Sequence, residues 1–190
     1  MIGDSDLFDG SRCTTCLLSS AMQRIDAHER NAGLPRIRLR PTAPADLPAL
    51  FEMQSDPQSN VMAGTKPRTR EAFFSIWASH FTNPDINSRV ILLESDEPEL
   101  VGGISRFQAE GVDCVGYWIA RPHWGKGIAS RALQLFLAED SRRPLHATAA
   151  RANLASRHIL EKCGFRCTGF RMGEETDRFI GCEIAEFVLS

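Results

Sequence analysis

Residues 124–129 run Trp124-Gly125-Lys126-Gly127-Ile128-Ala129, and this short segment says more about the fold than any other part of the 190-residue chain. It follows an apolar, strand-like segment at 115–119 and precedes a segment with helical periodicity. A glycine-rich turn between a strand and a helix leaves backbone N–H groups unpaired at the positive end of the helix, where they can bind phosphate. Glycine at 125 and 127 lets a ligand approach the backbone closely. The segment therefore predicts a phosphate-binding loop in an α/β fold.

The apolar periodicity on both sides of this loop predicts one mixed α/β domain over residues 36–190. Helical spacing of apolar residues predicts helices at about 44–55, 69–81, 129–137 and 155–163. Alternating or short apolar runs predict strands at 37–40, 89–94, 100–107, 114–119, 145–149, 165–170 and 182–189. The second and third of these strands are expected to form a hairpin through 95–98.

Residues 1–35 look like an N-terminal extension to this domain. Apolar residues at helical spacing predict a short amphipathic helix from about 16 to 30, ended by Gly33-Leu34-Pro35. This helix would pack either on the domain or on a second subunit, which leaves a homodimer open.

Charge and hydropathy exclude several classes of protein. The formal net charge of -2 gives no general attraction to nucleic acid or to an anionic membrane. No apolar run reaches the roughly 18–20 residues that span a bilayer, and the N-terminal residues do not resemble a secretory signal. We therefore expect a soluble, cytoplasmic protein with no nucleic-acid or membrane partner.

The six cysteines do not follow a disulfide framework, and we expect reduced thiols. The pair Cys13 and Cys16 invites an alternative, a zinc or redox site. Zinc would need two further ligands, and no second pair at suitable spacing follows. The sequence thus predicts no metal site.

Two motifs in order resemble the Gcn5-related N-acetyltransferase (GNAT) superfamily, within it the branch of the ribosomal-protein Nα-acetyltransferases (RimJ/RimL). The first is the Gln/Arg-x-x-Gly-x-Gly/Ala loop, matched by Trp124, Gly127 and Ala129, with Trp124 departing from the usual Gln or Arg. The second is Asn-x-x-Ser followed by Glu-Lys-x-Gly-Phe, matched by 153–156 and 161–165. The resemblance covers about 37–189.

The resemblance implies the acyl-CoA N-acyltransferase fold, a mixed, mostly antiparallel sheet of six to seven strands flanked by helices. It implies that acetyl-CoA lies between the strands ending at Ile119 and near Ala149, with its thioester carbonyl at N–H groups of 118–120. Asn153 would hold the strand end or the pantetheine arm, unless it only caps a helix. The cofactor-binding residues implied are Trp118, Ile119, Trp124, Gly125, Lys126, Gly127, Ile128, Ala129 and Asn153.

The proton donor to the departing thiolate is a separate question. Many superfamily members carry a Tyr at the position of Leu160, and the single tyrosine, Tyr117, lies on the preceding strand, so the sequence predicts no phenol here. In the branch that the chain resembles, the Ser of Asn-x-x-Ser takes this role. Ser156 and Asn153 are therefore the expected catalytic residues, with a helix cap as the alternative role for Ser156.

The acceptor is the least determined part of the prediction. A protein α-amine, with a pKa near 7.7–8.0, is neutralised at pH 7 for about 1–1.4 kcal/mol, against about 4–5 kcal/mol for a lysine amine. Because no strong base is evident, we expect a protein N-terminus as acceptor, with Glu94, Glu110, Asp113 or His123 as possible proton acceptors. A small-molecule amine such as an antibiotic or a metabolite, and a non-catalytic acyl-CoA-binding module, are the alternatives.

Overall fold

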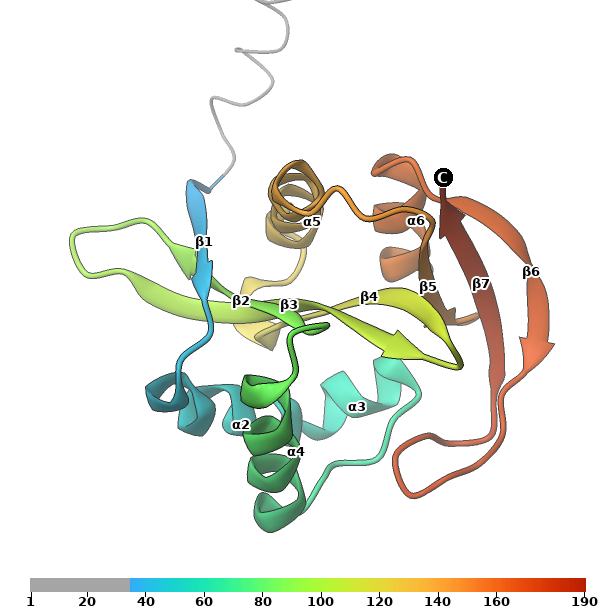
Figure 1. The fold of residues 1–190 in the computed structure, drawn as a ribbon, viewed down its shortest axis with the longest axis horizontal. Coiled ribbons are helices and arrows are strands. Elements are labelled where there is room, and N and C mark those ends of the chain that lie inside the picture. Colours follow the sequence, from blue (N-terminus) through green and yellow to red (C-terminus); the bar gives the residue numbers. More distant parts are fainter. Residues whose placement is uncertain (1–34) are drawn as a thin grey trace, which may run out of the picture. The chain divides into compact units, whose positions relative to one another are not determined.

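A seven-stranded sheet runs through residues 35–190, the part of the chain that the computed structural model describes (Figure 1). The strands lie in the order β1-β2-β3-β4-β5-β7-β6. Every neighbouring pair is antiparallel except β4 and β5. The predicted mixed, mostly antiparallel sheet is confirmed. The strands are β1 (Ile37–Pro41), β2 (Asn87–Leu93), β3 (Glu99–Ala109), β4 (Val112–Ile119), β5 (Leu145–Ala150), β6 (Arg166–Met172) and β7 (Glu183–Leu189).

Helices cover both faces of the sheet. In Figure 1, α5 and α6 lie on one face, and α2, α3 and α4 lie on the other. The helical elements are η1 (Pro44–Asp46), α2 (Leu47–Ser55), α3 (Pro57–Ala63), α4 (Arg70–Thr82), η2 (Arg121–His123), α5 (Ile128–Glu139) and α6 (Leu154–Lys162). The helix predicted at 16–30 and the pair Cys13/Cys16 fall outside the described residues. Among residues 35–190, no helix is long and apolar enough to cross a membrane.

Helix α3 is absent from the sequence prediction. It is only seven residues long, too short for apolar periodicity to stand out. Its start does carry a signal: Asp56 precedes Pro57, and the Asp56 carboxylate accepts a hydrogen bond from the Ser59 N–H at 2.8 Å. Gly64, with φ 67°, ends it in the left-handed conformation. This helix matters because it borders the site described below.

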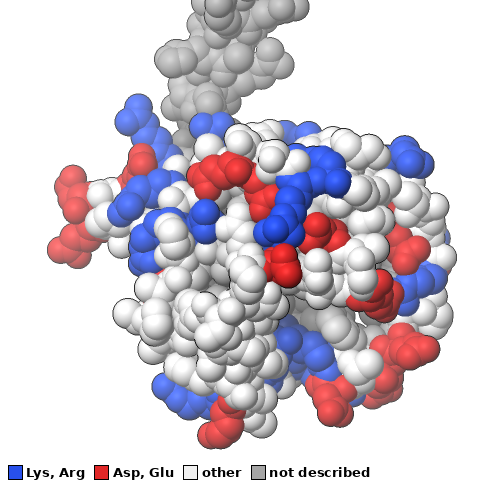
Figure 2. All heavy atoms as spheres, in the orientation of Figure 1, with Lys and Arg blue, Asp and Glu red and all other residues white. Residues whose placement is uncertain are grey.

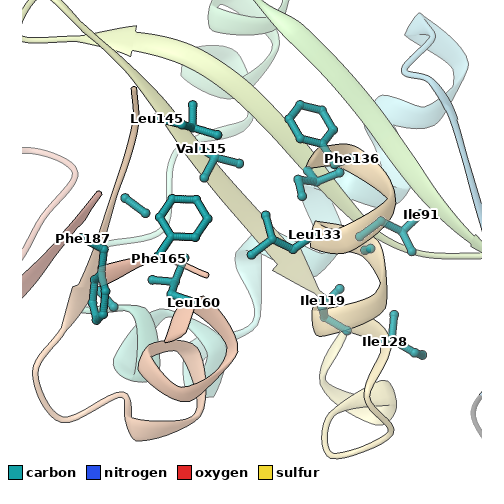
Figure 3. Packing of buried hydrophobic residues seen from close by; sticks show 14 of the residues in the cluster. Ile91, Val115, Ile119, Ile128, Leu133, Phe136, Leu145, Leu160, Phe165 and Phe187 are labelled. Atoms are coloured by element: carbon teal, nitrogen blue, oxygen red, sulfur yellow. The ribbon is translucent and has the colours of Figure 1, made fainter. Parts of the chain in front are cut away.

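The core has two parts, one on each face of the sheet. Strand β2 contributes residues to both parts, because successive side chains of a strand point to opposite faces of the sheet. Ile91 packs toward α5, whereas Val90 and Leu92 pack toward α2 and α4. Figure 3 shows Leu133 and Phe136 of α5 packed on the sheet, with Leu160 of α6 nearby. Each such side chain contributes about 1.5–3 kcal/mol on burial. The core thus fixes α5 and α6 against the sheet.

Strands β4 and β5 meet at one point only. Their single paired position is Cys114 with His146, near the start of both strands. The other strand pairs have ladders of five or more positions. Beyond Cys114 the two strands diverge toward Ile119 and Ala150, which leaves their facing backbone groups unpaired with each other. The strands therefore enclose an opening at the place where the family resemblance implies acetyl-CoA, between the strands ending at Ile119 and near Ala149.

Candidate active site

A cavity of about 490 Å³ occupies the opening between β4 and β5. Its wall is built from α3, the end of β4, the 123–127 turn, the first turn of α5, β5 and the first two turns of α6. The volume lies in the range of roughly 300–1,000 Å³ typical of ligand pockets. The fold therefore places a ligand-sized space where the sheet is interrupted.

The glycine loop at the mouth of this cavity offers unpaired amides. Gly125 and Gly127 have φ values of 73° and 75°, a left-handed conformation that favours glycine. Within residues 35–190, the backbone N–H groups of residues 125–130 have no hydrogen-bond acceptor, and they precede the twelve-residue helix α5. A Cβ atom added to Gly125 would meet no atom of the described residues within 4 Å. Unpaired amides, a helix N-terminus and open space fit a diphosphate group such as that of acetyl-CoA.

Most of the residues predicted to bind the cofactor border this cavity. Lys126 does not, because its exposed side chain lies outside the lining, so only its backbone amide belongs to the loop. The residues that line the cavity as predicted are Trp118, Ile119, Trp124, Gly125, Gly127, Ile128, Ala129, Asn153 and Ser156.

Two hydrogen bonds fix the position of the chain at the end of β4. The Trp124 indole Nε1 donates to the Ile119 carbonyl at 2.8 Å, which ties the glycine loop to the strand. The Ala120 N–H donates to Val101 O at 2.9 Å and is not free for a ligand, contrary to the prediction for 118–120. Because hydrogen bonds alternate along an antiparallel strand, the Ile119 N–H is directed away from β3, toward the opening. Ile119 is thus the amide that remains for a thioester carbonyl.

A phenol lies in the site, and the prediction that none would do so is wrong. The Tyr117 hydroxyl from β4 is 2.9 Å from Ser156 Oγ on α6 and 3.3 Å from the Ser156 carbonyl oxygen. Burial raises the pKa of Tyr117 to about 12, although the Ser156 hydrogen bond lowers it. Sequence spacing could not show this pair, because the two residues come from elements that meet only across the splayed strands. Tyr117 therefore stays protonated at neutral pH beside Ser156.

Asn153, not Ser156, caps helix α6. The Asn153 Oδ1 accepts a hydrogen bond from the Ser156 N–H at 3.0 Å. The alternative cap role for Ser156 is thus wrong, and its hydroxyl is free to pair with Tyr117. Asn153 fixes the start of α6 and so holds Ser156 in place.

The candidate proton acceptors separate into two groups. Glu94, Glu110 and Asp113 do not line the cavity, and Asp113 instead forms an ion pair with Arg106 at 3.3 Å. His123 does line it, with Nε2 3.1 Å from Glu99 Oε1. The His123 Nδ1 is buried and has no partner among residues 35–190. Of the four predicted candidates, His123 alone reaches the site.

Comparison with solved structures agrees with this architecture. The spermidine N-acetyltransferase of Vibrio cholerae, solved with CoA and spermine, matches with a TM-score of 0.67 at 18% identity, over 80% of this chain and 94% of that one. RimJ of Mycobacterium smegmatis, solved with CoA-disulfide, matches with a TM-score of 0.64 at 22% identity, over 80% and 81%. At such identities the likeness shows the fold. A comparison with curated proteins finds no match.

A family model establishes more than the fold. The model described as "Acetyltransferase (GNAT) domain" matches residues 36–166, which include the glycine loop, the Tyr117–Ser156 pair and the Asn153 cap. CoA or acetyl-CoA is bound in several of the structural neighbours. The chain belongs to the GNAT family of acetyl-CoA-dependent acetyltransferases.

Proposed function

We propose that this protein acetylates the α-amine of a protein N-terminus. The observation that carries the proposal is the chemistry of the cavity wall: among residues 35–190, no Asp or Glu lines it. A lysine-like amine would have to lose its proton here at a cost of about 4–5 kcal/mol at pH 7, whereas an α-amine costs about 1–1.4 kcal/mol. The site is therefore better suited to an amine that is already partly neutral.

Different residues of the site would bind the cofactor, stabilise the developing negative charge and donate a proton. Acetyl-CoA, when bound, supplies the thioester that a neutral amine attacks. The amides of the 125–130 loop would hold its diphosphate, and the Ile119 N–H would stabilise the negative charge that develops on the carbonyl oxygen. The Tyr117–Ser156 hydroxyl pair would donate one proton to the departing sulfur, and the proton that the attacking nitrogen loses to solvent balances the proton that the pair regains from solvent.

Two alternatives remain as outcomes of the test. A polyamine acceptor is suggested by the Vibrio cholerae neighbour, whose structure contains spermine, while RimJ and RimL are neighbours at similar identity. In the described part of the chain, no carboxylate that would attract a polycation lines the cavity. The second alternative is a module that binds acyl-CoA without catalysis. Its main support was the lack of a phenol at position 160, and the Tyr117 hydroxyl beside Ser156 removes that support.

The direct test measures thiol release with acetyl-CoA and a panel of amines. Peptides with a free N-terminus should react, with mass spectrometry locating the acetyl group on the α-amine. The same peptides with a blocked N-terminus and an internal lysine should not. Faster turnover of spermidine than of every peptide would contradict the proposal, as would thiol release with none of them.

The pH dependence of the reaction gives a second test. We expect kcat/KM for a peptide acceptor to rise about tenfold per pH unit and to level off near the α-amine pKa of 7.7–8.0. Because burial raises the pKa of Tyr117 to about 12, the donor keeps its proton throughout this range. The profile should therefore show no decline up to about pH 10, near the ordinary pKa of tyrosine. A decline centred between pH 8 and 10 would contradict a protonated Tyr117 as donor.

A further inference from the structure

Two partly buried arginines lie on the α2–α4 side of the sheet without an acidic partner. Arg178 belongs to the β6–β7 connection and Arg68 to the α3–α4 connection. Within residues 35–190, neither guanidinium lies within 4 Å of a carboxylate. Unpaired arginines are ordinary on a surface, but partial burial makes these two costly.

Their polar contacts are all neutral. The Arg178 Nη1 donates to Asn60 Oδ1 at 3.4 Å and to the Lys66 carbonyl oxygen. The Arg68 Nη1 is 3.5 Å from Gln54 Oε1. The Arg178 guanidinium also faces the Trp118 ring, 5.8 Å from its centroid. Trp118 connects the cavity to these arginines. It is one of the residues that line the cavity, and its ring contacts the Arg178 guanidinium.

Burial and mutual repulsion lower the pKa values of the basic groups in this region. Burial, and then the positive charge of Arg68, lower the pKa of Arg178 to about 10. Burial also lowers the pKa of Arg68, and burial followed by the Arg68 charge lowers the pKa of His80. Both arginines stay charged at pH 7, so the region holds two positive charges that an anion would stabilise.

Two other basic residues of this region have acidic partners. Lys66 Nζ is 2.7 Å from Glu175 Oε1, and Arg121 Nε is 3.0 Å from Asp56 Oδ2. Figure 2 shows basic side chains in a recess of the lower half of the face, beside the acidic side chains of the β6–β7 connection. Lys66 and Arg121 thus differ from Arg68 and Arg178, which have no carboxylate within 4 Å among residues 35–190.

We propose that Arg68 and Arg178 form a subsite for a carboxylate carried by the acceptor, one side chain away from the amine that is acetylated. The inference rests on the proposed function and narrows the acceptors to protein N-termini whose second residue is acidic. The planar guanidinium matches a carboxylate in a two-bond arrangement. The same charges repel a polyamine, which agrees with the cavity lining, where residues 35–190 place no carboxylate.

Peptides that share an N-terminal Ser and differ only in a second residue of Asp, Asn or Lys test this subsite. With the full chain and acetyl-CoA, kcat/KM should fall in the order Asp, Asn, Lys, with Asp at least about tenfold above Asn, as expected for one charge-assisted hydrogen bond. Arg178→Gln and Arg68→Gln should each reduce the Asp-to-Asn ratio about tenfold. Arg178→Lys keeps the positive charge but loses the planar guanidinium. Its Asp-to-Asn ratio should lie between those of the wild type and Arg178→Gln. Arg38→Gln, an exposed arginine on β1, should leave the ratio unchanged.

The wild-type comparison does not depend on any variant being folded, and equal rates for the Asp and Lys peptides would overturn the subsite. Calorimetric titration of the peptides into the CoA-bound protein tests it without turnover. Stronger binding of the Asp peptide with no thiol release would support the subsite and contradict the proposed function. Free aspartate supplies the same carboxylate without a peptide: if it reacts faster than the Asp peptide, the subsite stands but its acceptor is an amino acid.

Discussion

Tyr117→Phe should lower kcat by about 10²-fold or more while leaving the KM for acetyl-CoA within about threefold. The substitution removes only the hydroxyl that lies 2.9 Å from Ser156 Oγ, so the ring still fills its place between β4 and α6. Ser156→Ala should have an effect of similar size. Because the two hydroxyls form one hydrogen-bonded unit, the double variant should lose much less than the product of the single losses. Steady-state thiol release with a peptide acceptor measures all three.

A second hydroxyl pair in the same sheet provides the control. Ser88 Oγ and Ser105 Oγ are 2.7 Å apart on β2 and β3, and neither residue lines the cavity. Ser105→Ala removes a comparable hydrogen bond and should change kcat by less than about twofold. If Tyr117→Phe behaves like Ser105→Ala, the phenol is structural and the assigned proton donor is wrong.

Gly125→Val should weaken CoA binding by about 10²-fold or more. A β-branched residue disfavours the φ of 73°, so the loop would relax and turn its amides away from the ligand. Loss of even two charge-assisted hydrogen bonds at about 1.5–3 kcal/mol each accounts for such a change. Lys126→Ala should have a small effect, because its side chain lies outside the cavity lining. Calorimetric titration with CoA measures both dissociation constants.

Gly111→Val separates backbone strain from ligand binding. Gly111 has a φ of 78° in the β3–β4 turn, and, as at Gly125, an added Cβ would meet no atom within 4 Å. Both variants should lose thermal stability to a similar extent, but only Gly125→Val should lose CoA affinity. Equal CoA affinities for the two variants would contradict the role assigned to the loop.

The fold was largely predictable because its signals are local. Alternation in the strands, the helical face of residues 129–137 and the glycine turn each follow from neighbouring residues, and all agree with the structure. The short helix α3 was not predicted, because seven residues show too little apolar periodicity, although Asp56 and Pro57 mark its start. The splay of β4 from β5 was expected only through family resemblance, since a single pair at Cys114 leaves no trace in the sequence.

The site was predictable where it is built from one segment, as in the loop from Trp124 to Ala129. It was not predictable where distant segments meet. The phenol comes from β4 and not from the expected helix position, and the arginine pair comes from two connections far apart in the chain. For the same reason, sequence position suggested Glu94, Glu110 and Asp113 as bases, although none reaches the cavity.

The most direct measurement is a crystal structure of the protein bound to CoA. We predict that the diphosphate oxygens accept hydrogen bonds from backbone N–H groups between Gly125 and Ser130, and that the sulfur lies within hydrogen-bond reach of the Tyr117 or Ser156 hydroxyl. CoA bound elsewhere, or a sulfur far from both hydroxyls with the loop amides bonded to protein atoms, would contradict the account.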